Sequence, residues 1–314
     1  MAQAPVGLVL APTDPSEAAA RAVLRFHLRT FAREGVGARA GEVEPVHQLR
    51  VATRRLRAAL ELFAPVLPAP LAAEARADLA SLGHAIGEVR DLDVLALAVA
   101  AHARRLAPEL RAGLGPLERA LEARRAAAHA VMVGALDSAR GRSVVAGLTA
   151  LARSGAAPRG VTLGALAPEL VHPLVRALVR AGRRVDDRSP PEAVHRVRVR
   201  AKRLRYALET LRGLGGRPLA RVLRRLERLQ EILGDYQDAV TQAAWLRRWA
   251  EEADVPRVTL LATGALIDRL GRRARRRRAR FARTWRRLDR RRLARVLPRR
   301  KRPRRALRLV RTSA

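Results

Sequence analysis

The sequence of 314 residues contains no cysteine, which excludes disulfide bonds, cysteine nucleophiles and zinc sites built on thiolates. Aromatic residues make up only 3% of the chain, which weighs against folds that stack nucleobases on aromatic side chains. No apolar run approaches the roughly 18 residues that suggest a transmembrane helix, and the N-terminal stretch lacks the basic start of a secretory signal. We therefore expect a cytoplasmic protein.

Acidic residues are also scarce: 29 of them stand against 64 lysines and arginines, for a formal net charge of +35. Only two of the basic residues, Lys202 and Lys301, are lysine. Such a charge favours polyanionic partners over cationic or neutral substrates, and guanidinium groups donate paired hydrogen bonds to phosphate oxygens. A GC-rich coding sequence also raises the arginine content, so the spacing of the basic residues carries more information than their number.

Apolar residues three and four apart, in a background rich in Ala, Leu, Arg and Glu, predict helices throughout, with no convincing strand pattern. Proline and glycine mark the helix ends. Gly35, Gly37 and Gly41 are expected to end the first helix, and Gly87 to bend the third. The predicted helices span about 14–34, 46–64, 71–106, 117–153, 163–185, 191–213, 217–252 and 256–289.

Two motifs occur twice, in the same order. Residues 46–63 (VHQLRVATRRLRAALELF) and 194–211 (VHRVRVRAKRLRYALETL) are identical at ten of eighteen positions, at an offset of 148 residues. Residues 86–94 (IGEVRDLDV) and 233–241 (LGDYQDAVT) share a glycine, an acid and an aspartate at an offset of 147. This internal duplication predicts an all-α protein made of two pseudosymmetric four-helix bundles. We divide the chain into an N-terminal segment 1–13, a first bundle 14–153, a linker 154–162, a second bundle 163–290 and a tail 291–314.

Each copy of the longer motif places basic side chains on one face of its helix. At 100° per residue, Arg50, Arg54 and Arg57 fall within about 80° of His47, and apolar residues occupy the opposite face. We define the first stripe as His47, Arg50, Arg54 and Arg57, and the second stripe as His195, Arg198, Lys202 and Arg205. A solvated polar face is the alternative interpretation, but it gives no reason for the same order to occur twice.

Like charges three or four residues apart repel each other, although Glu61 and Glu209 lie on the same faces and offset part of the repulsion. The stripes therefore suit an anionic partner. Two stripes that face each other across a pseudo-twofold axis would line a channel for a long, thin, densely charged anion. An unbranched phosphate chain fits such a channel better than a broad DNA duplex does.

The segments VHxxRVxxRRLRxxLExF and VHRxRxxAKRLRYALE, together with GEVRDLDV and LGDYQDAV, resemble the CHAD domain, the conserved histidine α-helical domain, over about residues 14–290. The resemblance implies two pseudosymmetric bundles, a basic central groove that binds inorganic polyphosphate, and association with polyphosphate granules in some members. It places all eight stripe residues at the phosphate. Arg55 and Arg203 match the family pattern but lie about 80° around the helix, and Arg90 matches the shorter motif, although Gln237 replaces it in the second copy.

Many relatives carry a triphosphate-tunnel (CYTH) domain with an ExExK motif, which only Glu42-Val43-Glu44 approaches in this chain. We therefore expect a stand-alone member that binds polyphosphate and is not an enzyme. Asp91 and Asp238 have no second acid placed for a hydrolase, so they are expected to hold stripe arginines. No cofactor or metal is expected. The alternative, a phosphate hydrolase or transferase, would depend on a divalent metal.

The last 44 residues hold 21 arginines and one lysine against a single acid. Arg273, Arg276, Arg280 and Arg283 repeat the spacing of the stripes, so their helix is a further candidate for lining the groove. The tail 291–314 is expected to be flexible. This basic tail favours the alternative function, in which the protein associates with nucleic acids and binds polyanions without sequence selectivity.

Overall fold

The computed structural model describes residues 8–153, 160–186, 189–286 and 293. These residues form α-helices joined by short connections, with no β-strand among them, so the all-α prediction is confirmed. Among the described helices, none is long and apolar enough to cross a membrane. The predicted tail 291–314, apart from Leu293, and most of the predicted linker lie outside the described residues.

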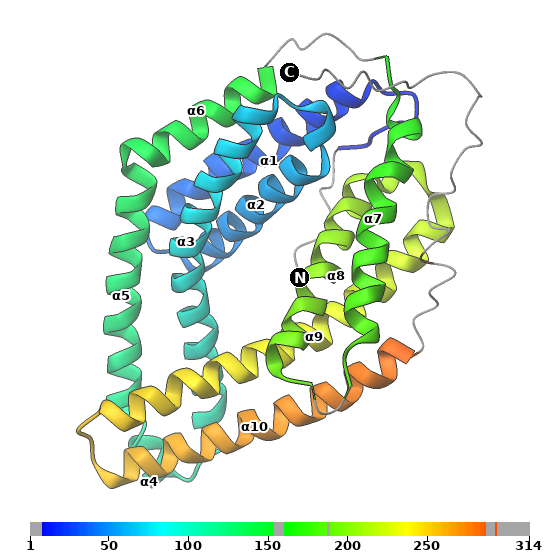
Figure 1. The fold of residues 1–314 in the computed structure, drawn as a ribbon. Helices are drawn as coiled ribbons and strands as arrows, with labels where there is room; N and C mark the ends of the chain where they lie inside the picture. The colour runs from blue at the N-terminus through cyan, green and yellow to red at the C-terminus, as the bar shows by residue number, and fades with distance from the viewer. Residues whose placement is uncertain (1–7, 154–159, 187–188, 287–292, 294–314) are drawn as a thin grey trace, which may run out of the picture.

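Ten α-helices are described, and they pack in the same order in the two halves of the chain (Figure 1). The first half contains α1 (Ser16–Arg39), α2 (Val43–Leu62), α3 (Ala69–Ala103), α4 (Pro108–Ala112), α5 (Gly115–Asp137) and α6 (Ala139–Arg153). The second half contains α7 (Leu163–Arg183), α8 (Pro191–Thr210), α9 (Gly216–Glu252) and α10 (Arg257–Arg286). Contacts run from α1 through α2 and α3 to α5, and from α7 through α8 and α9 to α10. The halves meet where α2 packs on α8, α1 on α7, and α10 on α4 and α5.

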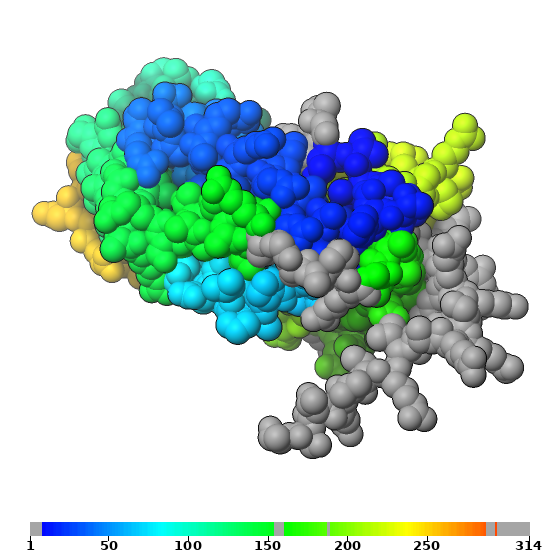
Figure 2. Space-filling view, turned by 90° about the horizontal axis from the view of Figure 1, so that it is seen from above, coloured from blue at the N-terminus to red at the C-terminus, as the bar shows by residue number. Residues whose placement is uncertain are grey.

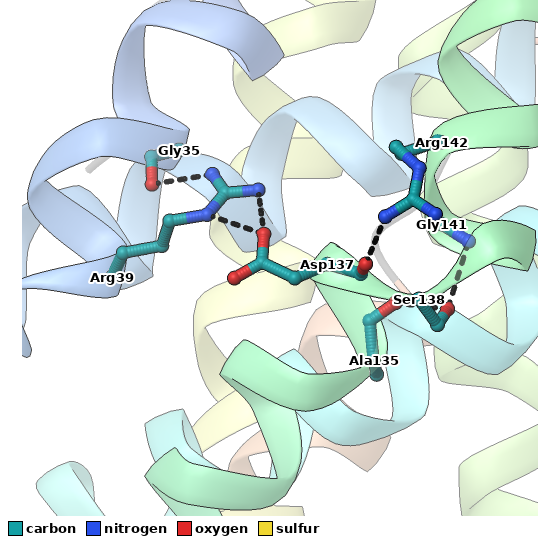
Figure 3. A network of polar contacts seen from close by, with 7 residues as sticks. All are labelled: Gly35, Arg39, Ala135, Asp137, Ser138, Gly141 and Arg142. Carbon is teal, nitrogen blue, oxygen red and sulfur yellow. Dashed lines mark hydrogen bonds and ion pairs between the residues drawn. The ribbon is translucent and has the colours of Figure 1, made fainter.

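The region 117–153, expected as a helix with a shorter continuation, is divided at Ser138 into α5 and α6. Ser138 caps the start of α6, because its hydroxyl accepts a hydrogen bond from the amide of Gly141 at 3.0 Å (Figure 3). Arg39, at the end of α1, holds the corner through an ion pair with Asp137 at 2.7 Å. The helix α6 then packs on α1 and α3, and Figure 2 shows α1 (blue) and α6 (green) side by side on the surface. The first half therefore has one more long helix than the second.

The first helix is longer than predicted, because α1 continues through Gly35 and Gly37 to Arg39. These two glycines do not end the helix. A Cβ atom at Gly37 would lie 2.7 Å from the ring of Pro45, so this glycine allows the start of α2 to pack closely against α1. The helix ends before Gly41, whose φ of +81° is the left-handed conformation that glycine adopts most readily.

The helix α3 continues through Gly87, where a bend was expected, and ends at Ala103. The Arg50 guanidinium lies 3.1 Å from the position that a Cβ of Gly87 would occupy, and it donates a hydrogen bond to the Gly87 carbonyl. The absence of a side chain at Gly87 therefore gives a stripe arginine room to lie against α3.

Candidate functional site

Both stripes lie where α2 and α8 meet, at the junction of the two halves. The opposite faces of these helices bury apolar residues completely, including Leu49 and Leu56 on α2 and Val197 and Leu204 on α8. This burial fixes the rotation of each helix about its axis. As a result, six of the eight stripe residues are half-buried between elements, and Arg57 and His195 are exposed.

Four basic side chains from the two stripes gather into what we call the central cluster: Arg50, Arg54, Arg198 and Lys202. Burial lowers the pKa of Lys202 to about 6, and the positive charges of Arg54, Arg198 and Arg50 add to the effect. Burial also lowers the pKa of Arg54, with contributions from Arg50 and Arg198. The two helices thus bring like charges from distant parts of the sequence close enough to repel each other.

Two ion pairs cross between α2 and α8, and they link equivalent positions of the sequence repeat. Arg55 contacts Glu209 at 3.1 Å, and Arg203 contacts Glu61 at 3.1 Å. The first pair is buried, with 8% and 4% of its side chains exposed, whereas the second is open, at 42% and 34%. Burial raises the pKa of Glu209, and the charges of Arg205 and Arg55 oppose that rise. Arg55 and Arg203 therefore hold the two helices together in this structure.

The aspartates of the shorter motif pair with stripe arginines, as the sequence predicted. Asp91 of α3 lies 3.0 Å from Arg50, and Asp238 of α9 lies 4.0 Å from Arg198. Burial raises the pKa of Asp238, although the charges of Arg198 and Lys202 oppose that rise. Each aspartate belongs to the helix that follows its stripe helix along the chain.

The two histidines of the stripes differ in their surroundings. Burial, together with the positive charge of Arg90, lowers the pKa of His47. The exposed His195 instead shares a hydrogen bond between its Nδ1 and the Gln237 side-chain oxygen, at 3.0 Å. Arg90 and Gln237 occupy equivalent positions of the shorter motif. Arg90 therefore adds a cation beside the first stripe, and the second stripe has a neutral amide in the same place.

Tyr206 is a member of the site that the sequence analysis did not select. Its hydroxyl accepts a hydrogen bond from Arg54, and the guanidinium carbons of Arg54, Arg55 and Arg205 lie 5.4, 5.8 and 5.5 Å from its ring centroid. Arg205 also pairs with Glu209 at 3.1 Å. The first copy has Ala58 in place of Tyr206, so a search for repeated residues passes over it.

The helix α10 joins the site through Asp235 of α9, a second residue that was missed. Asp235 forms ion pairs with Arg273 at 3.1 Å and with Arg277 at 2.6 Å. The remaining predicted arginines of α10, Arg276, Arg280 and Arg283, line an open groove between the end of α3 and α10, as does Arg273. The repeat could have indicated Asp235, because this residue occupies the position of Glu88 in the first copy. Glu88 likewise forms an ion pair with a later helix, through Arg124 of α5 at 2.9 Å.

Within the described parts of the chain, no group of three or more histidine and acidic side chains is arranged to hold a metal ion. The acids nearest the central cluster, Asp91 and Asp238, are engaged with arginines. The arrangement therefore offers many hydrogen-bond donors of positive charge and few free acceptors.

Comparisons with known proteins identify one family. The sequence profile of the CHAD domain matches residues 22–247. Two uncharacterised proteins of Mycobacterium tuberculosis, from strains CDC 1551 and H37Rv, are each 30% identical over 230 residues, which cover 69% of this chain and 42% of theirs. The chain thus spans less than half the length of these curated relatives.

Two solved structures share the fold. The crystal structure of the CHAD domain from the plant Ricinus communis matches 92% of this chain and 96% of its own, with a TM-score of 0.76 and 28% identity. PptA from Streptomyces chartreusis matches 88% of this chain and all of its own, with a TM-score of 0.70 and 22% identity, which supports the fold alone.

Proposed function

Because this chain belongs to the CHAD domain family, a family linked to polyphosphate binding, we propose that it binds inorganic polyphosphate along the two facing stripes. The observation that carries the proposal is the central cluster. Burial, and then the charges of Arg54, Arg198 and Arg50, disfavour the charged form of Lys202, as its lowered pKa reflects. A bound polyanion would offset that cost.

The hydrogen-bonding character of the cluster supports a ligand made of acceptors. The buried Nε of Arg198 has no hydrogen-bond partner among the described residues, and Lys202 lies between arginines of both helices. A phosphate chain offers only oxygen acceptors and negative charge, which matches such donors. The aromatic ring of Tyr206 is already surrounded by three guanidinium groups, so it is a poor platform for a base.

The proposed role is binding rather than catalysis. The acids that adjoin the cluster are paired with arginines, so they are poorly placed to activate water or to hold a catalytic metal. We further propose that the protein acts in the cytoplasm, at polyphosphate granules. Release of orthophosphate from polyphosphate in the presence of magnesium or manganese would contradict the non-enzymatic role.

A competition titration tests the function directly. Labelled long-chain polyphosphate bound to the protein is challenged with duplex DNA, RNA and ATP at physiological salt, using the full chain and a chain that ends at residue 290. We expect polyphosphate to remain bound to both. If DNA or RNA displaces it equally well, the protein binds polyanions in general; if the shorter chain loses all binding, the Arg-rich tail is responsible.

The pKa of Lys202 predicts that binding takes up a proton. With a pKa of about 6, this amine is largely neutral in the free protein from about pH 7 upward, and a bound anion raises its pKa again. Between about pH 7 and pH 9, the affinity for polyphosphate is expected to increase as pH falls, by up to about tenfold per pH unit for the uptake of one proton. Calorimetric titration in buffers of different ionisation enthalpy measures the uptake.

The matched variant for this prediction is Lys202→Arg. Arginine remains charged throughout this range, so the variant should bind at least as tightly as the wild type at the upper end of the window and lose most of the proton uptake. An equal pH dependence in the variant and the wild type would show that another group takes up the proton, with His47 the first candidate.

A further inference from the structure

The arginine-lined groove beside α10 is separate from the central cluster. It has a volume of about 760 Å³ and is bounded by Ala98 and Ala101 of α3 and by Arg105, just beyond that helix, on one side and by α10 on the other. None of the four residues of the central cluster is among its lining residues.

Only cationic and apolar side chains line the groove. Seven of its twelve lining residues are arginine and the other five are alanine or leucine. No described carboxylate forms an ion pair with Arg105, Arg276, Arg280 or Arg283. A groove with this lining offers donors and positive charge without a single side-chain acceptor, and it has no aromatic ring.

Two aspartates of α9, one helical turn apart, connect the groove with the central cluster. Arg273 and Arg277 both line the groove and bind Asp235 of α9. One helical turn further along α9, Asp238 contacts Arg198 of the central cluster at 4.0 Å. From Arg269 to Arg283, the arginine face of α10 extends the basic surface by about 21 Å along the helix axis.

We propose that the α3–α10 groove is a second binding segment for the same polyphosphate chain, so that the protein selects long chains over short ones. The inference rests on the proposed function of the stripes. A long chain contacts the central cluster and the groove together, and the second contact then forms at high effective concentration. A short oligophosphate occupies the central cluster alone. RNA is disfavoured in the groove, since its lining has neither acceptors for base edges nor rings for stacking.

The test removes three exposed groove arginines together, in Arg276→Ala, Arg280→Ala and Arg283→Ala. The chain offers a matched control: Arg176, Arg180 and Arg183 on α7 have the same spacing, are also exposed and do not line the groove. Both triple variants lose the same charge, and alanine favours the helix. Circular dichroism and thermal unfolding establish that both remain folded.

Affinities are measured for long-chain polyphosphate and for tripolyphosphate. Relative to the α7 control, the groove variant is expected to lose about tenfold or more in affinity for the long chain, from three lost guanidinium contacts, and to bind tripolyphosphate unchanged. Equal long-chain affinities in the two triple variants would overturn the inference and leave the proposed function standing. A matching loss for tripolyphosphate would also overturn it, by making the groove the primary site. If the wild type binds neither ligand, the proposed function itself fails.

Discussion

Replacing Arg50, Arg54 and Arg198 together by glutamine is expected to weaken polyphosphate binding by at least about a hundredfold, because each lost charge-assisted hydrogen bond is worth about 1.5–3 kcal/mol. Glutamine keeps a donor for the Gly87 carbonyl and the Tyr206 hydroxyl, which Arg50 and Arg54 now contact. The fold should therefore persist, and relief of the repulsion among like charges should maintain or raise the melting temperature.

Fluorescence anisotropy with labelled polyphosphate measures this loss. The control is again the triple replacement of Arg176, Arg180 and Arg183, here by glutamine, which removes the same charge from an exposed face of α7. In the cluster variant, the plot of log affinity against log salt concentration should become shallower, by the contribution of about three phosphate contacts. If both variants lose affinity equally, binding depends on net charge, and the central cluster is not the site.

Arg55→Ala is expected to lower the free energy of unfolding by about 3 kcal/mol, the largest effect of any single charge substitution that we predict. The substitution leaves Glu209 buried, with only 4% of its side chain exposed and Arg205 as its remaining ion-pair partner. That remaining partner places the loss at the low end of the range for breaking buried pairs. Urea unfolding followed by circular dichroism gives the value.

The repeat supplies the control, because Arg203→Ala breaks the equivalent but exposed pair with Glu61. This variant should lose no more than about 1 kcal/mol, as exposed pairs do. The pKa of Glu209 is already raised by burial, and losing Arg55 raises it further, so the folded state of Arg55→Ala favours the protonated acid. The destabilisation should thus shrink as pH falls through that pKa. Equal losses in the two variants would show that burial of the pair is irrelevant to stability.

Much of the site could be predicted from the sequence repeat. The aspartates that occur in both copies, Asp91 and Asp238, were expected to hold stripe arginines, and the structure pairs Asp91 with Arg50 and Asp238 with Arg198. Comparing two copies within one chain separates positions that keep their charge from positions that drift. The helices themselves could also be predicted, since the apolar periodicity of the sequence indicates which face of α2 and α8 is buried.

Features that depend on contacts between distant segments could not be predicted from the sequence. Gly35 and Gly37 were expected to end the first helix, because local propensity disfavours glycine, yet close packing against Pro45 outweighs that preference. Tyr206 has no counterpart in the first copy, and its partners are Arg54 and Arg55 from the first half and Arg205 from the second. The different burial of the Arg55 and Arg203 ion pairs has no trace in the repeat, where the two positions are identical.

The sequence by itself determined that the protein is helical, duplicated and strongly basic, and it identified two stripes with their anchoring aspartates. These properties follow from local periodicity and from charge, which each segment carries wherever it lies. Only the tertiary structure decided that the stripes converge into one cluster, that the pKa of Lys202 is lowered there, and that α10 forms a groove against α3. The physical reason is that desolvation and Coulomb repulsion depend on distances between helices, which packing sets and no single segment encodes.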